Sequence, residues 1–229
     1  MIVAINKPKG ITSHDVVNKI RKITNVKRVG HGGTLDPLAS GVLVVAIGRD
    51  STKKLGEILK NADKEYEATI EFGKTSPTDD AEGTITPVKT KSILNKAKLL
   101  LALKKFTGTI EQIPPAYSAV KISGRPAYKI ARKGNRVALK ERKVTIKEAK
   151  LVSFDPPVAK IKFVVSSGTY IRSIARDLGK YLNVGGYLKE LTRTRVGGFK
   201  IQDSLGLGNL AQQLQIKGAK EDGVVYVGK

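Results

Sequence analysis

The residues with the clearest chemical potential lie in one glycine-rich stretch, GHGGTLDPLASG, at residues 30–41. Its glycines allow tight turns and close backbone approaches, and Pro37 stiffens the chain directly after Asp36. A loop of this kind can hold the carboxylate of Asp36 at the edge of a cleft, where it is available for chemistry. Aspartate before proline also commonly caps a turn, so spacing alone leaves both roles open for Asp36.

Other stretches that resemble chemical sites fail on closer inspection. The chain has no cysteine, which excludes disulfide frameworks, thiolate zinc sites and cysteine nucleophiles. Its two histidines, His14 and His31, argue against a metal centre built on histidine. The GKT sequence at 73–75 lacks the upstream glycine of a phosphate-binding P-loop. The SHD sequence at 13–15 begins a helix, where capping is expected rather than a catalytic triad, and the acidic cluster at 79–82 is typical of a turn with Asx bonding.

Charge and hydropathy patterning favour a polyanionic partner. The 229 residues include 42 Lys and Arg against 20 Asp and Glu, a formal net charge of +22 at pH 7. The basic residues are spread from Lys7 to Arg195, as on a folded face laid along phosphates, although a Lys-rich protein without such a partner has a similar composition. No run approaches 18 apolar residues and no secretion signal is visible, so a cytoplasmic protein that does not span a membrane is expected.

Periodicity predicts an α+β domain that positions the aspartate loop. The predicted helices begin at Ser13 and Ser92 and cover 171–178, and the predicted strands cover 42–47, 65–72, 144–154 and 158–166. These elements indicate a mixed, mostly antiparallel sheet flanked by helices and loops. The segment at about 112–135 is rich in Pro, Gly and Lys, which predicts an inserted, mobile, basic loop.

Several motifs, in order along the chain, resemble the TruB family of tRNA pseudouridine synthases. Besides the aspartate loop they are NKPKGITS at 6–13, KEYEA at 64–68, PPAYSAVKISGRPAY at 114–128, SSGTYIRSIARDLG at 166–179 and LTRTRVGGF at 191–199. The resemblance implies the pseudouridine synthase fold, with one catalytic domain over 1–204 and a thumb-like RNA-binding insertion at about 112–135. Residues 205–229 are then a short tail, truncated relative to the family's further RNA-binding domain.

The resemblance implies three catalytic residues. Asp36 corresponds to the catalytic aspartate, which acts on a uridine whose glycosidic C–N bond is replaced by a C–C bond, through attack on either uracil C6 or ribose C1′. Arg172 corresponds to an arginine whose positive fork keeps that carboxylate ionised and oriented. Tyr66 corresponds to a tyrosine that stacks on the target base and helps to remove the C5 proton, although a plain core tyrosine fits the same alternation.

The resemblance also implies contacts to RNA around the reacting uridine. Tyr170 and Leu191 correspond to positions that line the pocket of the flipped base, and His31 corresponds to a histidine that occupies the gap left in the stack. Lys7 is predicted either to be structural or to contact phosphate. The cations expected to grip the T arm of tRNA are Lys121, Arg125, Lys129, Arg132 and Lys133.

The implied reaction is the isomerisation of uridine 55 in the T loop of tRNA to pseudouridine. It consumes neither water nor redox equivalents, so no metal and no organic cofactor are expected. A monomer without an obligate protein partner is predicted. Two alternatives remain open: the catalytic subunit of a guide-RNA-dependent pseudouridine synthase, and a non-catalytic RNA-binding protein.

Overall fold

The computed structural model describes residues 1–208 and 210–212, which form two compact units. One unit contains residues 1–66 together with residues 191–208 and 210–212, and the other contains residues 67–190. The division falls inside strand β4 (Lys64–Phe72) and inside strand β12 (Gly186–Val196), so each of these strands contributes to both units. One catalytic domain over 1–204 therefore stays a prediction, and most of the predicted tail at 205–229 lies outside the described residues.

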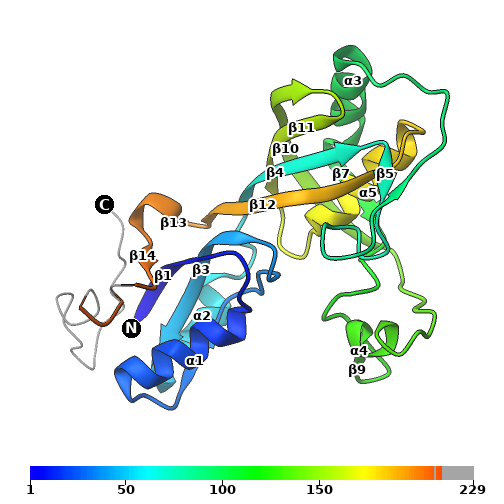
Figure 1. The fold of residues 1–229 in the computed structure, drawn as a ribbon. Coiled ribbons are helices and arrows are strands. Elements are labelled where there is room, and N and C mark those ends of the chain that lie inside the picture. The colour runs from blue at the N-terminus through cyan, green and yellow to red at the C-terminus, as the bar shows by residue number, and fades with distance from the viewer. Residues whose placement is uncertain (209, 213–229) are drawn as a thin grey trace. The chain divides into compact units, whose positions relative to one another are not determined.

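The first unit is built on a mixed sheet in the order β14–β1–β3–β12 (Figure 1). Strands β1 (Ile2–Lys7) and β3 (Ser40–Ile47) are antiparallel, whereas β14 (Leu205–Gly206) runs parallel to β1 and β12 runs parallel to β3. The short strands β2 (Val29–His31) and β13 (Phe199–Lys200) pair in antiparallel fashion with β3 and β12. A 3-10 turn, η1 (Ile201–Asp203), leads into β14.

Both faces of this sheet are buried, which explains the unbroken apolar run in β3. Alternate residues of β1 and β3, among them Val3 and Leu43, belong to one core cluster with helix α1 (Ser13–Thr24). The intervening residues, among them Ala4 and Val44, belong to a second cluster with helix α2 (Arg49–Ile58). The strand predicted at 42–47 is confirmed, and it reaches the aspartate loop at its N-terminal end.

Helix α1 has a different cap from the one predicted. Thr12 Oγ1 accepts a hydrogen bond from the backbone N of Asp15 at 3.1 Å, and Asp15 Oδ2 accepts one from the backbone N of Thr12 at 2.8 Å. These two bonds form a capping box, which satisfies two backbone donors at the helix start. The prediction of Ser13 as the cap is wrong, because Ser13 is the first helical residue and its side chain is buried.

The second unit contains the predicted hairpin, formed by β10 (Arg142–Asp155) and β11 (Val158–Val165). Strand β7 (Gly108–Gln112) pairs with the other edge of β10, and two further short strands, β5 (Lys74–Thr75) and β6 (Thr86–Pro87), pair with each other. Helix α3 (Lys96–Phe106) packs against β10 and against helix α5 (Ile171–Tyr181). The hairpin and the helix at 171–178 are confirmed.

The predicted start of helix α3 at Ser92 is wrong. The helix is capped by Asn95, whose side chain accepts a hydrogen bond from the backbone N of Lys98 at 2.9 Å. Ile93, which the helical pattern had included, lies before the helix and is 75% exposed. Serine and asparagine are both good caps, so local sequence does not decide between them.

Residues 113–141 form an insertion between β7 and β10, which we call the thumb insertion. It contains a hairpin of β8 (Lys121–Ile122) and β9 (Arg125–Pro126), followed by the short helix α4 (Ala127–Ala131). The loop predicted at about 112–135 therefore has secondary structure of its own. Gln112 belongs to β7 rather than to the insertion.

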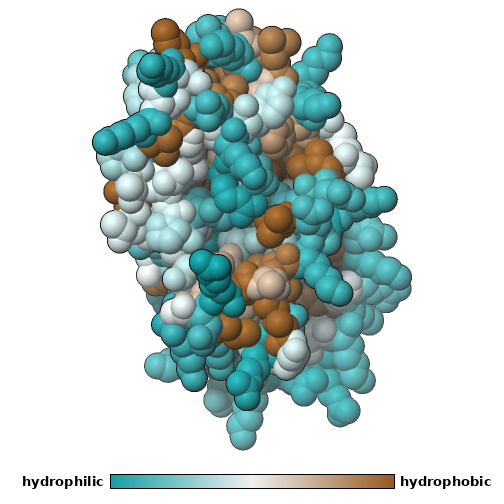
Figure 2. All heavy atoms as spheres, turned by 90° about the vertical axis from the view of Figure 1, so that its right-hand side faces the viewer, coloured by the Kyte–Doolittle hydropathy of each residue, from teal (hydrophilic) through white to brown (hydrophobic). Residues whose placement is uncertain are grey.

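Hydrophilic side chains cover most of the face shown in Figure 2, with smaller hydrophobic patches between them. This surface fits a chain with a formal net charge of +22. In residues 1–208 and 210–212, no helix combines the length and the apolar character needed to cross a membrane.

A carboxylate cluster ties three strands of the second unit together. Glu71 in β4 is 6% exposed and accepts hydrogen bonds from Lys74 Nζ at 2.7 Å, Lys189 Nζ at 2.9 Å and the hydroxyl of Tyr187 at 2.9 Å. The hydrogen bonds from Lys74 and Lys189 lower the pKa of Glu71 to about 2 from its ordinary value of 4.5. Burial and the bond to Glu71 raise the pKa of Tyr187 to about 12.

We expect Glu71→Gln to lower the free energy of unfolding at pH 7 by about 1–3 kcal/mol, because it weakens hydrogen bonds to a charged group. The folded pKa of Glu71 is depressed, so its contribution is present above about pH 4.5 and is lost as the pH falls toward 2. Urea unfolding at pH 7 and pH 3 measures the difference between wild type and variant, which should shrink at pH 3. Glu67→Gln, an exposed neighbour in β4, is the matched control. A gap that stays constant between the two pH values would contradict this account of Glu71.

Candidate active site

Asp36 lies in the loop between β2 and β3, within the first unit, and is half-buried. Its backbone O accepts a hydrogen bond from the N of Ala39 at 3.1 Å, which closes a turn over Pro37 and Leu38. The carbonyl of Pro37 accepts a hydrogen bond from the N of Gly10 at 2.8 Å. The backbone at Asp36 and directly after it is thus fixed by hydrogen bonds.

Ser13 holds the residue that precedes Asp36. Its hydroxyl donates to the O of Leu35 at 2.9 Å and accepts from the N of Leu35 at 2.8 Å. Both Ser13 and Leu35 are 3% exposed, so these bonds are shielded from water. The sequence had assigned Ser13 to capping, whereas the structure gives it the role of joining α1 to the aspartate loop.

Arg193 is a second residue that the sequence analysis missed. It lies in β12, is 1% exposed, and donates hydrogen bonds to carbonyls of the aspartate loop at Gly33 and Thr34. The motif LTRTRVGGF contains Arg193, but the alternation of polar residues in it gave no sign that this side chain is buried. A buried cation is therefore bonded to the backbone of the loop that carries Asp36.

Burial and positive charge near the loop lower the pKa of two basic neighbours. Burial and the charge of Arg193 lower the pKa of His31 below its ordinary value of 6.5, so its imidazole is neutral at pH 7. The Nδ1 atom of His31 is buried and makes no hydrogen bond within the part of the chain that the structure describes. Burial and Arg193 also lower the pKa of Lys64.

Tyr66 and Leu191 are both buried, at 7% and 9% exposure. The alternation in β4 predicted an inward Tyr66, and this is confirmed. Burial fits a pocket wall and a core residue equally well, so the contacts of Tyr66 and Leu191 with a base stay predictions.

Lys7 is fully buried, and its Nζ donates to the carbonyls of Pro8 and Ile11, each at 2.8 Å. These bonds close the turn between β1 and α1, which matches the structural role considered for this residue. The alternative contact of Lys7 with phosphate stays a prediction.

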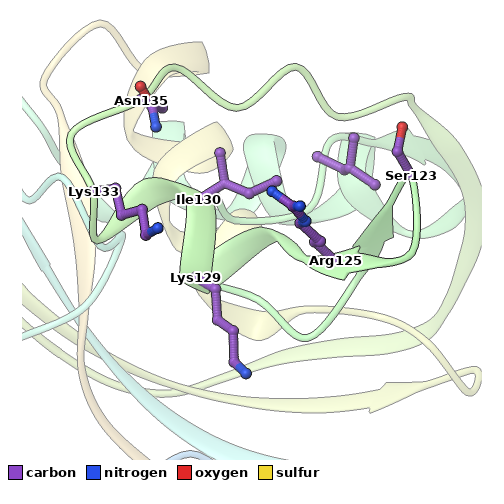
Figure 3. Close-up of a pocket in the computed structure, with 7 residues that line it drawn as sticks. Ser123, Arg125, Lys129, Ile130, Lys133 and Asn135 are labelled. Carbon is purple, nitrogen blue, oxygen red and sulfur yellow. The ribbon is translucent and has the colours of Figure 1, made fainter.

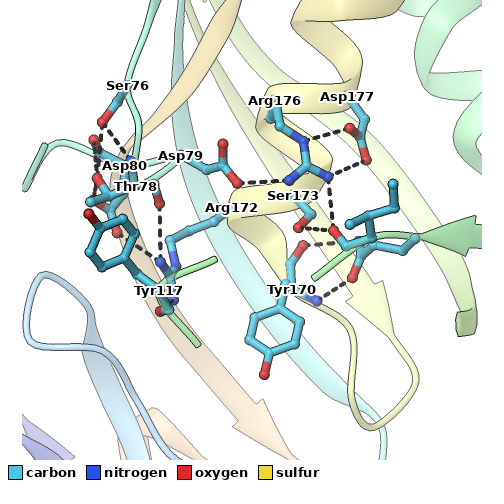
Figure 4. Close-up of polar contacts among 12 residues, drawn as sticks. Ser76, Thr78, Asp79, Asp80, Tyr117, Tyr170, Arg172, Ser173, Arg176 and Asp177 are labelled. Carbon is cyan, nitrogen blue, oxygen red and sulfur yellow. Dashed lines mark hydrogen bonds and ion pairs between the residues drawn. The ribbon is translucent and has the colours of Figure 1, made fainter. Parts of the chain in front are cut away.

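Arg172, in α5 of the second unit, is 4% exposed and binds groups of its own unit (Figure 4). Its Nη1 lies 3.4 Å from Asp80 Oδ2 and donates to the O of Thr78 at 3.1 Å, and its Nη2 donates to the O of Tyr117 at 3.0 Å. Asp80 Oδ1 also accepts from the N of Glu82 at 3.0 Å, which confirms the Asx bonding predicted for the acidic cluster. The ion pair with Arg172 was not predicted.

Arg176, one turn further along α5, forms a second charged cluster (Figure 4). Its guanidinium pairs with Asp79 Oδ2 at 2.9 Å and with both carboxylate oxygens of Asp177, at 2.8 and 3.1 Å. Burial raises the pKa of Asp79 to about 6, against the opposing charges of Arg176 and Arg172. The acidic turn at 79–80 therefore supplies a partner to each of the two arginines.

Helix α5 also holds the base of the thumb insertion. Ser173 Oγ and Arg176 Nη2 donate to the O of Ile113, at 2.8 and 2.9 Å. Gln112 exchanges two hydrogen bonds with the backbone of Tyr170, at 3.1 and 2.8 Å. With the bond from Arg172 to Tyr117, the first residues of the insertion are anchored to the helix that carries Arg172.

Tyr170, predicted to line the base pocket, is the N-cap of α5 and is half-buried. The guanidinium of Arg142 lies over its ring, 4.7 Å from the centroid, in a cation–π contact. Its contact with a flipped base stays a prediction.

The five cations predicted to bind RNA all lie in the thumb insertion and are exposed: Lys121, Arg125, Lys129, Arg132 and Lys133. Arg125, Lys129 and Lys133 line an open pocket together with Ile122 and Ile130 (Figure 3). Such a basic surface, with apolar side chains between the cations, suits a nucleic-acid backbone and its bases.

Comparison with known proteins gives the same family for most of the chain. The model of the TruB family pseudouridylate synthase N-terminal domain matches residues 21–171, and that of the tRNA pseudouridylate synthase B C-terminal domain matches residues 172–225. Over 223 residues the chain is 44% identical to tRNA pseudouridine synthase B of Thermobifida fusca, covering 94% of this chain and 75% of the relative. It is 45% identical over 216 residues to the protein of the same name from Mycobacterium tuberculosis, covering 93% of this chain and 72% of the relative.

Solved structures share the fold. A Cbf5-Nop10-Gar1 complex contains a chain with a TM-score of 0.72 and 32% identity, and an H/ACA RNP bound to a substrate RNA containing 2′-deoxyuridine contains one with a TM-score of 0.68 and 29% identity. These matches cover 92% and 99% of this chain but only 53% and 56% of theirs, so the chain spans about half the length of those solved chains. The family models and the close relatives show that this chain belongs to the TruB family of pseudouridylate synthases, which are isomerases.

Proposed function

We propose that this chain isomerises uridine 55 in the T loop of tRNA to pseudouridine. The observation that carries the proposal is a half-buried aspartate on a loop fixed through its backbone, in a chain 44–45% identical to curated tRNA pseudouridine synthase B proteins. A nucleophile needs such fixed geometry, because misplacement by about 1 Å costs roughly 100-fold in rate.

The chemistry assigned to Asp36 is nucleophilic attack by its ionised carboxylate, on uracil C6 or on ribose C1′. The attack forms a covalent bond between the carboxylate and C6 or C1′, the N1–C1′ bond breaks, and uracil turns while it is held in the site. A C5–C1′ bond then forms, the bond to Asp36 breaks, the proton on C5 leaves, and N1 takes up a proton. Substrate and product are isomers, so the reaction needs no co-reactant. The base must leave its stack to be reached, and a flipped uridine is the species that we assign to the site.

The neighbouring roles follow the family pattern. Tyr66 stacks on the base and helps to remove the C5 proton, and Arg172 is assigned to the reaction as the family's active-site arginine. Tyr170 and Leu191 line the pocket, and the neutral, flat imidazole of His31 occupies the space left by the flipped base. Lys7 supports this region through the turn that it closes.

The thumb insertion grips the T arm through its exposed cations. Its anchoring to α5 at Ile113 and Tyr117 supports this role, because a fixed base presents the cations in a constant position. The enzyme acts as a cytoplasmic monomer on an isolated T arm, without a guide RNA or a protein partner. The likeness to a chain of an H/ACA RNP bound to a substrate RNA keeps guide-dependent catalysis as the second candidate.

We expect Asp36→Asn to abolish pseudouridine formation in an unmodified T-arm hairpin, lowering the single-turnover rate by at least about 10⁴-fold, while RNA binding is retained. The amide has nearly the shape of the carboxylate but is not a nucleophile at this step. Mapping of pseudouridine and tritium release from 5-tritiated uridine measure the reaction, and a filter-binding assay measures the affinity.

Asp155→Asn is the matched control, since it removes the same charge from an exposed position at the end of β10 and should leave the rate unchanged. Full activity of Asp36→Asn would overturn the enzyme mechanism. Activity of the wild type only when a guide complex is added would shift the function to the second candidate.

We expect Arg125, Lys129 and Lys133, replaced together by alanine, to weaken T-arm binding about 10- to 100-fold at physiological salt. Each lost phosphate contact should also reduce the slope of log affinity against log salt concentration by about 0.7–0.9. Fluorescence anisotropy at several salt concentrations measures both quantities.

The control replaces Lys96, Lys104 and Lys105 of α3, which are exposed and carry the same total charge. It should change the affinity by no more than about threefold and the slope by less than about 0.5. Equal losses in the two triple variants would mean that only net charge matters and that the thumb insertion is not the RNA-binding surface.

A further inference from the structure

We propose that Arg193 is a positioning residue for catalysis, because its buried guanidinium fixes both ends of the loop that carries Asp36. The proposal rests on Asp36 as the nucleophile of the proposed function. Arg193 is assigned no contact with RNA, and it acts through the backbone of the loop.

The guanidinium reaches carbonyls before and after Asp36. Its Nη2 donates to the O of Gly33 at 3.2 Å and its Nη1 to the O of Thr34 at 3.3 Å, both upstream of Asp36. Its Nε donates to the O of Val42, in β3 downstream, at 2.8 Å. One rigid, planar group therefore links two segments that are separated by the whole aspartate turn.

The backbone of Arg193 also lies in close contact with the end of the same loop. Strand β12 pairs in parallel with β3. In this pairing Thr192 lies beside Ser40, and Arg193 lies beside Gly41. Gly41 has a φ of +102°, and a Cβ there would lie 2.2 Å from the O of Arg193, so only glycine fits. The hydroxyls of Ser40 and Thr192 lie 3.1 Å apart in hydrogen-bond contact.

The chemistry of arginine suits this task better than that of other residues. Three donors point in fixed directions from one plane, whereas the ammonium of lysine is a point charge on a flexible stem. A buried cation held by carbonyls is also a poor way to gain stability, since removing its charge from water is costly. The arrangement is better explained by the geometry that it imposes on the loop.

Ser13 holds the same segment through a second, independent pair of hydrogen bonds. With Arg193 on Gly33 and Thr34 and Ser13 on Leu35, three consecutive residues before Asp36 are held. Loss of either set of hydrogen bonds leaves the carboxylate of Asp36 chemically unchanged, but its position is no longer fixed. The expected defect is therefore in the rate of reaction and not in RNA affinity.

The test compares Arg193→Lys and Ser13→Ala with wild type in single-turnover assays on a T-arm hairpin, with rates expressed per folded molecule. We expect Arg193→Lys to lower the rate at saturating RNA about 100-fold and Ser13→Ala about 10-fold, with the Kd for RNA within threefold of wild type. Arg21→Met is the control, because Arg21 also donates to a backbone carbonyl, that of Val29 at 3.1 Å, but outside the loop. It should keep the wild-type rate even if its Tm falls.

The outcomes separate this proposal from the proposed function. If Asp36→Asn is inactive while Arg193→Lys and Ser13→Ala keep the wild-type rate, the nucleophile stands and the positioning role is overturned. If Arg193→Lys lowers only Tm, with an unchanged rate per folded molecule, the residue is merely structural. If Arg193→Lys does not fold, the rate of Ser13→Ala is the test. A wild-type rate in Ser13→Ala then contradicts the proposal.

Discussion

A loop rich in glycine is free to adopt many conformations, and a nucleophile on such a loop works only if something else removes that freedom. Here Ser13 and Arg193 do so, through hydrogen bonds to the backbone at residues 33–35 and 42. These bonds fix the backbone of the loop and do not involve the side chain of Asp36. The sheet of the first unit serves this arrangement, since β1, β3 and β12 bring α1 and Arg193 to the same loop.

The second unit uses one buried and one partly buried cation in a related way. Arg172 and Arg176 bind the acidic turn at 79–80 and also the first residues of the thumb insertion, at Tyr117 and Ile113. The guanidinium proposed to act in catalysis is thus bonded to the segment proposed to bind RNA. A single hydrogen bond, from Arg172 to the O of Tyr117, therefore links the two proposed roles within this unit.

Sequence patterns predicted those parts of the fold that depend on local periodicity. The apolar run at 42–47 and the alternation that buries Tyr66 follow from burial on sheet faces, and both are confirmed. Side chains whose partners lie far along the chain could not be predicted in this way. Arg193 stands in a motif of alternating polar residues, and its carbonyl partners are more than 150 residues away. Thr12 and Ser13 can both cap a helix, and Asp15, three residues after Thr12, completes a capping box with Thr12. The bonds of Ser13 to the distant Leu35 could not be predicted from local sequence.

The central claim is that Asp36 is presented to a uridine that has left its stack. The crystal structure of the Asp36→Asn protein bound to an unmodified T-arm hairpin tests this most directly. The account predicts an everted target uridine whose C6 or C1′ lies within about 4 Å of the side chain at position 36, close to reacting distance. A uridine still stacked in its loop, with the residue 36 side chain facing solvent and touching no nucleotide, would contradict it.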